Sequence, residues 1–184
     1  MFNPKKALKY EEISGPLSVI REKILTEYNG IYLDELDNLI TKVRIFQTHF
    51  ATLDIRQNHS VHKRVVEEIL IQNQRISGGL DGLNDEEMID ILLHDDYRID
   101  PLQFEDEVVR DTLINMLQLP RIQEKNGERG CNRYIISNSE DIYSVLFVWA
   151  LFRWSGIQEV NFDIVPLFET MIGMAEAAGI MEQL

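Results

Sequence analysis

The chain has 184 residues, of which 45% are hydrophobic and 27% charged; these proportions are typical of a soluble globular protein and exclude intrinsic disorder. Its 18 basic and 31 acidic residues give a formal net charge of −13, so neither a nucleic-acid backbone nor an anionic membrane surface is expected as a partner. The length favours a single domain spanning 1–184.

Cysteine content and apolar run lengths predict a cytoplasmic protein. Cys131 is the only cysteine, which excludes an internal disulfide, fits a reducing compartment and predicts a small apolar core residue. The stretch Met1–Glu12 has basic residues with no apolar run behind them, so it does not look like a secretory signal. The longest apolar run, Val145–Phe152, is far too short to span a membrane.

Residues 1–50 are predicted to form leading helices. The pair Gly15–Pro16 is expected to interrupt the chain, after which hydrophobic residues recur at helical spacing as far as the turn at Asn29–Gly30. A second amphipathic helix is predicted over Leu33–Phe46. These helices lead to the first strand.

Three short apolar runs, at about 51–57, 133–138 and 162–169, are predicted strands, each followed by a helical pattern. The last two are joined by one helix, which predicts a parallel pair. Three parallel strands make a poor sheet alone, because parallel sheets need both faces covered and exposed edges managed. The sequence therefore indicates a mostly helical α/β segment of a larger fold.

The remaining elements are predicted helices with recognisable ends. Asn84 followed by Glu87 predicts a capping box. Ser139 is expected to be an N-cap, and Pro120 is expected to stop a helix. The predicted helices are one that begins at Ser60, then Asp85–His94, Phe104–Leu119, Ile142–Trp154 and Met171–Leu184.

Two charged residues end predicted strands, where parallel α/β folds place their chemistry. Arg56 can grip a phosphate or carboxylate with two parallel hydrogen bonds, or it can form a structural ion pair with an acid such as Asp54. Glu169 can supply an oxygen ligand to Mg²⁺, or it can be a solvated or capping residue. Spacing alone leaves both pairs of alternatives open.

Other candidates have structural explanations. His59 and His62 would share a helix face, but zinc needs a further ligand that nothing nearby supplies, so His62 is expected to orient the helix start through a hydrogen bond. The aromatic residues between Phe147 and Trp154 are too apolar for a cofactor site and predict a core or an interface between segments.

Three motifs in this order and spacing resemble the phosphoenolpyruvate carboxylase family. They are LDIRQ (Leu53–Gln57) with His62, YIIS (Tyr134–Ser137) and VPLFET (Val165–Thr170). The resemblance runs from about Tyr10 to the end of the chain and covers a middle part of the family's longer polypeptide.

The resemblance implies a partial (β/α)₈ (TIM) barrel segment with three parallel strands and elaborating helices, in a family usually assembled as a homotetramer. It implies conversion of phosphoenolpyruvate and bicarbonate to oxaloacetate and phosphate with Mg²⁺ or Mn²⁺, through carboxyphosphate and an enolate, which feeds the tricarboxylic acid cycle. It assigns Arg56 to the phosphate of the substrate, as the catalytic and substrate-binding residue, and Glu169 to the metal.

The chain also departs from the family pattern. Asn58 and His59 stand where an acidic residue and serine are usual, Gln47 replaces a common glycine, and Asn138 replaces a methionine. The family's TAHPT, DSAKD-type and FHGRGG motifs do not occur in the chain. The metal site is therefore expected to be incomplete, and the isolated chain to be inactive without the remaining barrel segments of the same polypeptide.

Two alternatives remain from the residues alone. One is a non-catalytic helical interaction module derived from such an enzyme, which would bind partner chains through the Phe147–Trp154 surface. The other is an unrelated α/β enzyme that uses Arg56 and Glu169 on a phosphorylated substrate.

Overall fold

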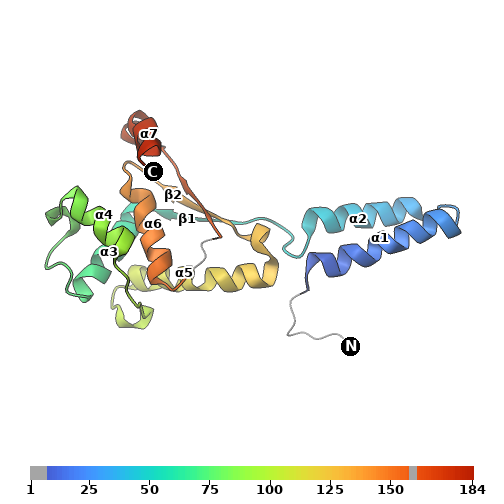
Figure 1. The fold of residues 1–184 in the computed structure, drawn as a ribbon, viewed down its shortest axis with the longest axis horizontal. Helices are drawn as coiled ribbons and strands as arrows, with labels where there is room; N and C mark the ends of the chain where they lie inside the picture. Colours follow the sequence, from blue (N-terminus) through green and yellow to red (C-terminus); the bar gives the residue numbers. More distant parts are fainter. Residues whose placement is uncertain (1–7, 158–160) are drawn as a thin grey trace. The chain divides into compact units, whose positions relative to one another are not determined.

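A computed structural model describes residues 8–157 and 161–184 (Figure 1). The chain groups into two compact units. That its length favours a single domain stays a prediction. The smaller comprises Met1–Leu53 with Arg121–Cys131, and the larger comprises Asp54–Pro120 with Asn132–Leu184. Most of the N-terminal stretch used to exclude a secretory signal lies outside the described residues.

The smaller unit is built on a hairpin of two helices, α1 (Tyr10–Glu27) and α2 (Leu33–Phe46), with the bounds of α2 as predicted (Figure 1). The guanidinium of Arg21 on α1 grips the carboxylate of Asp37 on α2 through bonds of 2.6 and 3.0 Å. The predicted turn at Asn29–Gly30 is confirmed: both residues have positive φ, and the Gly30 N–H donates to the Ile24 carbonyl of α1.

The predicted interruption at Gly15–Pro16 is wrong, because α1 continues through Pro16. Proline removes one backbone donor and normally breaks or kinks a helix interior. Here α1 packs against α2, and the Arg21–Asp37 ion pair holds the part of α1 after Pro16 on that partner helix. Tertiary packing overrides the local signal.

The helix predicted to stop at Pro120 is likewise longer, since α5 runs from Glu107 to Asn126 with Pro120 inside it. Pro120 is the last residue of the helix that belongs to the larger unit. The continuation ends at Gly127, whose φ is +84°, and leads into the short 3-10 helix η3 (Glu128–Gly130). The next residue, Cys131, is buried as predicted.

The larger unit contains a sheet of three parallel strands in the order β1–β2–β3, which confirms the predicted parallel arrangement (Figure 1). The strands are shorter than expected. They are β1 (Asp54–Asn58), β2 (Arg133–Ser137) and β3 (Asp163–Pro166). The described strands form an open sheet in which β1 and β3 are the edges.

One face of this sheet carries the core. Tyr134 and Ile136 of β2 are buried, whereas Arg133, the first residue of this strand, is exposed, as the alternation of side chains along a strand requires. Helices α3 (His59–Gln72) and α6 (Tyr143–Trp154) contact each other and the sheet, and α4 (Asp85–His94) packs on α6. The other elements of this unit are the 3-10 helices η1 (Leu80–Gly82) and η2 (Pro101–Gln103), and α7 (Met171–Gln183).

The aromatic run on α6 divides between core and surface. Phe147, Phe152 and Trp154 are buried, which agrees with the core prediction, but the Trp149 side chain is 38% exposed. Within the described ranges, no helix is long and apolar enough to cross a membrane.

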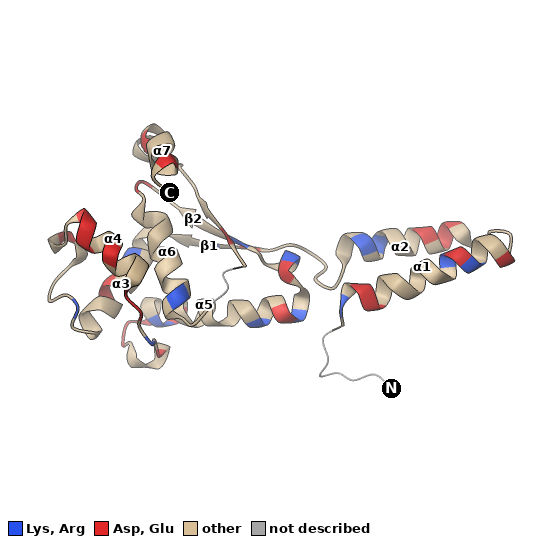
Figure 2. Ribbon diagram, viewed as in Figure 1, with Lys and Arg blue, Asp and Glu red and all other residues tan. Residues whose placement is uncertain are grey.

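Two predicted helix caps had different outcomes. The capping box is confirmed: the Asn84 side chain accepts from the Glu87 N–H, and the Glu87 side chain accepts from the Asn84 N–H. This end of α4 carries a cluster of acidic residues (Figure 2). Ser139 is not a cap, because it is fully buried and its hydroxyl donates to the Ile136 carbonyl. The N-cap position is Ile142, and the side chain of the preceding residue, Asp141, accepts from the Ser144 N–H.

Candidate functional site

Arg56 lies on the exposed face of β1, with 57% of its side chain accessible. It does not pair with Asp54, the structural partner considered from the sequence. Asp54 forms an ion pair of 2.8 Å with Arg133 of the neighbouring strand. The guanidinium of Arg56 is therefore directed elsewhere.

The partner of Arg56 is Glu169. The Arg56 Nη2 atom lies 3.1 Å from Oε2 and 3.3 Å from Oε1 of that carboxylate, so the structure brings together the two predicted site residues. They lie 113 positions apart in the chain. In the register, Arg56 stands level with Ile135 of β2 and Val165 of β3, so the ion pair reaches across the middle strand.

Glu169 sits between the end of β3 and the start of α7. The next residue, Thr170, caps α7 by accepting from the Gly173 N–H at 2.9 Å. The cap fixes the start of α7 immediately after Glu169. The carboxylate, 40% exposed, thus projects from a fixed position at the carboxyl end of the sheet.

Asn138, which in the sequence is marked only as a departure from the family pattern, provides a second bond to this carboxylate. It follows the last residue of β2 and has φ of +57°, in the left-handed region that asparagine tolerates better than most residues. Its backbone N–H donates to Glu169 Oε1 at 3.1 Å. A polar residue with left-handed preference directly after a strand is the sequence signal for this turn.

The chemistry available to this pair is that of one guanidinium and one carboxylate. The guanidinium can bind a phosphate or carboxylate group, and the carboxylate can supply an oxygen ligand to a hard divalent cation. In residues 8–157 and 161–184, no group of three or more His, Cys, Asp and Glu side chains is placed to hold a metal ion. Among the described residues, Glu169 is therefore not part of a cluster of three or more such ligands.

His62 has the orienting role expected of it. Its Nε2 atom lies 2.9 Å from the Tyr134 hydroxyl, and both side chains are buried between α3 and β2. Burial, with a smaller effect from nearby His59, lowers the pKa of His62 to about 3. Burial also raises the pKa of Tyr134. Both groups are therefore neutral at physiological pH and join the helix to the strand.

A hollow of about 250 Å³ lies beside His59, lined by α3, η1, α4 and the start of α6. Its polar groups bond one another: Lys63 pairs with Asp81 at 2.9 Å, and the Tyr143 hydroxyl donates to Asp85 at 2.6 Å. The His59 ring stacks on Phe147, and burial lowers the pKa of His59. These contacts pair Lys63, Asp81, Tyr143 and Asp85 with one another, whereas the buried His59 Nδ1 atom has no hydrogen-bond partner among the described residues.

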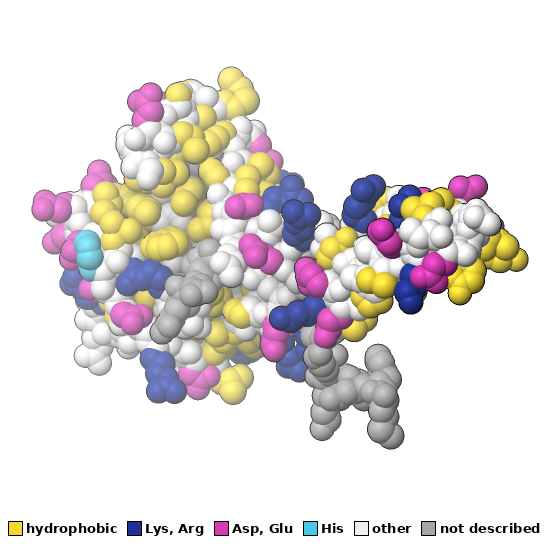
Figure 3. All heavy atoms as spheres, turned by 45° about the vertical axis from the view of Figure 1, so that its right-hand side comes forward, with side chains coloured by type: hydrophobic (Ala, Val, Ile, Leu, Met, Phe, Trp, Pro, Cys, Tyr) yellow, Lys and Arg dark blue, Asp and Glu magenta, His cyan; other side chains and the backbone are white. Residues whose placement is uncertain are grey.

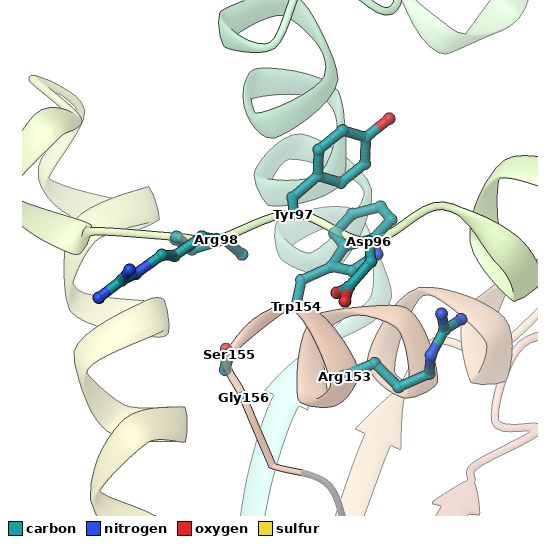
Figure 4. A pocket seen from close by; sticks show the side chains of 8 residues that line it. Asp96, Tyr97, Arg98, Arg153, Trp154, Ser155 and Gly156 are labelled. Carbon is teal, nitrogen blue, oxygen red and sulfur yellow. The ribbon is translucent and has the colours of Figure 1, made fainter.

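A larger hollow of about 570 Å³ lies beside the end of α6 (Figure 4). The guanidinium groups of Arg98 and Arg153 lie on opposite sides of it and do not converge on one position (Figure 4). Arg153 donates to the Leu92 and Asp95 carbonyls at 3.1 and 3.2 Å, and the Trp154 indole donates to the same Asp95 carbonyl at 2.9 Å. These residues serve to hold the end of α4.

Comparison with known proteins agrees with the sequence motifs. A family model described as phosphoenolpyruvate carboxylase matches residues 3–184. A phosphoenolpyruvate carboxylase of Synechocystis is 31% identical over 183 residues, covering 95% of this chain and 18% of that protein. One from Prochlorococcus marinus is 28% identical over 195 residues, covering 99% of this chain and 19% of its own.

A third relative, the phosphoenolpyruvate carboxylase of Corynebacterium diphtheriae, is 28% identical over 186 residues and is covered over 20% of its length. The chain thus spans about a fifth of the length of the curated relatives that it matches. The Arg56–Glu169 pair, the three parallel strands and a family match along almost the whole sequence lead to one conclusion: the chain belongs to the phosphoenolpyruvate carboxylase family.

Proposed function

We propose that this chain supplies one sector of a phosphoenolpyruvate carboxylase active site, in which phosphoenolpyruvate and bicarbonate yield oxaloacetate and phosphate. The single observation that supports this most directly is the meeting of Arg56 and Glu169 at the carboxyl end of a parallel sheet. In this proposal the three strands are part of a (β/α)₈ barrel, and the uncovered sheet edges meet the remaining barrel segments of the same polypeptide.

Arg56 is proposed to bind the phosphate of phosphoenolpyruvate. Its side chain is well exposed and presents a planar fork of donors that matches phosphate geometry. A local cation is needed because the chain as a whole carries a net charge of −13 and repels anions at long range. When the phosphoryl group leaves the enolate, this guanidinium remains beside the phosphoryl group and balances the charge of that group.

Glu169 is proposed to ligate Mg²⁺ or Mn²⁺. A carboxylate oxygen is the ligand type that these hard cations take in proteins, usually with one or two carboxylates and several waters. A metal held there would stabilise the negative charge that develops on a substrate oxygen. Since Glu169 is one ligand, the other protein ligands are proposed to come from the remaining barrel segments of the same polypeptide.

The isolated chain is proposed to lack turnover, and the working enzyme to be a cytoplasmic homotetramer that feeds the tricarboxylic acid cycle. The proposed inactivity rests on the sequence of the chain, which contains no TAHPT, DSAKD-type or FHGRGG motif. Removing even one group that stabilises developing charge costs on the order of 100-fold or more in rate.

Binding of phosphoenolpyruvate by the chain tests the proposal. Ligand-observed NMR should detect weak binding that R56Q abolishes and that R133Q, which removes another paired arginine of the same sheet, retains. Equal loss in both variants, or no binding by the unsubstituted chain, would refute the assignment of Arg56. In an oxaloacetate-coupled assay, measurable turnover by the 184-residue chain would refute the proposed inactivity.

The second candidate, a helical interaction module, has weaker support. The Phe147–Trp154 surface on which it was based is mostly core, with only Trp149 appreciably exposed among its aromatic residues. Exposed hydrophobic side chains occur instead on α7, and Figure 3 shows hydrophobic groups gathered below that helix. These exposed residues of α7 are Met171, Ile172, Met174 and Met181. A monodisperse monomer that binds no hydrophobic dye would argue against this candidate.

A further inference from the structure

We infer that Glu169 is the resting counter-ion of Arg56, so that anion binding at Arg56 and cation binding at Glu169 each release the other residue and favour each other. Asn138 is the positioning residue that keeps the carboxylate in place once the arginine lets go. This inference rests on the proposed roles of Arg56 and Glu169 but predicts a behaviour that those roles alone do not require.

The first step is competition for the guanidinium. One donor nitrogen, Nη2, contacts both carboxylate oxygens of Glu169 at 3.1 and 3.3 Å. Phosphate seeks the same type of donor, and it carries the same sign of charge as the carboxylate. An anion at Arg56 must therefore displace Glu169 or accept its repulsion at close range, and either outcome weakens anion binding.

The second step is the reciprocal competition for the carboxylate. A divalent cation at Glu169 would take the oxygens that now face Arg56, and the guanidinium would repel it. Cation binding therefore frees Arg56, and anion binding frees Glu169. By linkage, each ligand must raise the affinity of the other by the same factor.

The third step concerns what stays in place. The Asn138 N–H holds Oε1 at 3.1 Å from the backbone, and its position is set by the left-handed turn after β2. Thr170 fixes the residue on the other side as the cap of α7. When Arg56 turns to an anion, the carboxylate stays beside β2, where it is preorganised for a cation.

The size of the effect follows from exposure. The two side chains are 57% and 40% accessible, so the pair is solvent-screened. Exposed ion pairs change an equilibrium by about fivefold at most. Replacing Glu169 with glutamine should therefore tighten anion binding at Arg56 by about two- to fivefold, even though glutamine abolishes the proposed metal ligand.

The experiment titrates inorganic phosphate into the metal-free 184-residue chain at constant ionic strength, and follows the Arg56 Nε–H signal by NMR, assigned by its loss in R56K. E169Q is compared with D54N, which removes one negative charge from β1, the strand that carries Arg56, and frees Arg133 instead of Arg56. We expect a lower dissociation constant in E169Q and an unchanged one in D54N. The Asn138 amide signal should keep its hydrogen-bonded shift at saturating phosphate and lose it in E169A, which removes the acceptor.

Three outcomes would count against the inference. If Arg56 responds to phosphate equally in the unsubstituted chain and in E169Q, the counter-ion role fails while the proposed phosphate role stands. If D54N tightens binding as much as E169Q, the effect is general charge and the inference fails. If Arg56 does not respond to phosphate in either protein, the proposed function of Arg56 fails and the inference fails with it.

Discussion

The Nε2 atom of His62 lies 2.9 Å from the hydroxyl of Tyr134, and this bond joins α3, the helix that follows β1, to the middle strand of the sheet. Both side chains are buried, and their rings lie 5.5 Å apart. Within the described residues, the other ring nitrogen of His62 has no hydrogen-bond partner. The contact therefore holds a neutral imidazole in the core beside β2, the strand that Asn138 follows.

The stability of the chain should fall as the pH drops from 7 to 5. Burial lowers the pKa of folded His62 to about 3, whereas an unfolded histidine titrates near 6.5, so the unfolded state takes up the proton first. The stabilisation is complete above the unfolded pKa and is lost toward the folded one. We expect a loss of about 2 kcal/mol at pH 5, measured by urea unfolding. H62Q removes this titration and should flatten the slope; an equal slope in H62Q would contradict the assignment.

Y134F should destabilise the chain by about 1–3 kcal/mol, because it leaves a buried nitrogen of His62 without its partner. Urea unfolding at pH 7 measures the change. The double variant with H62Q should lose less stability than the sum of the two single losses, because the effects of substitutions at groups in direct contact are not additive. Strict additivity would show that the hydroxyl and the imidazole do not interact.

G173A should be strongly unfavourable, and G179A in the same helix should not. A Cβ atom at Gly173 would lie 2.4 Å from the Ser139 carbonyl oxygen, whereas one at Gly179 meets nothing within 4 Å. We expect a loss of about 1–3 kcal/mol for G173A and a gain of up to about 1 kcal/mol for G179A. Thermal melts followed by circular dichroism compare them, and similar melting temperatures would show that α7 does not approach Ser139 this closely.

N84A should lower stability by about 1 kcal/mol through loss of the capping box at the start of α4. N84D keeps an accepting oxygen and provides the matched control, with little change expected. Chemical denaturation measures both variants. A loss in N84D equal to that in N84A would mean that the side-chain acceptor does not stabilise the helix.

Local chemistry was enough for many of the elements. The α2 helix has its predicted bounds because its apolar residues repeat at helical spacing, and the Asn84 cap follows from residues three positions apart. The parallel strands followed from the alternation of short apolar runs with helical patterns. Where the sequence signal was a single residue, it failed: Pro16 and Pro120 lie inside helices, and Ser139 is buried rather than capping.

The sequence by itself was enough to identify the family motifs, the candidate site residues Arg56 and Glu169, and the strands that these two residues follow or belong to. Only the tertiary structure decided which alternative partner each residue takes. Arg56 pairs with Glu169 because the parallel register places them on either side of β2, while Asp54 is taken by Arg133. The bond from Asn138 to Glu169 was likewise hidden, because the asparagine predicts only a turn, and its backbone N–H acts only where the fold brings an acceptor to it.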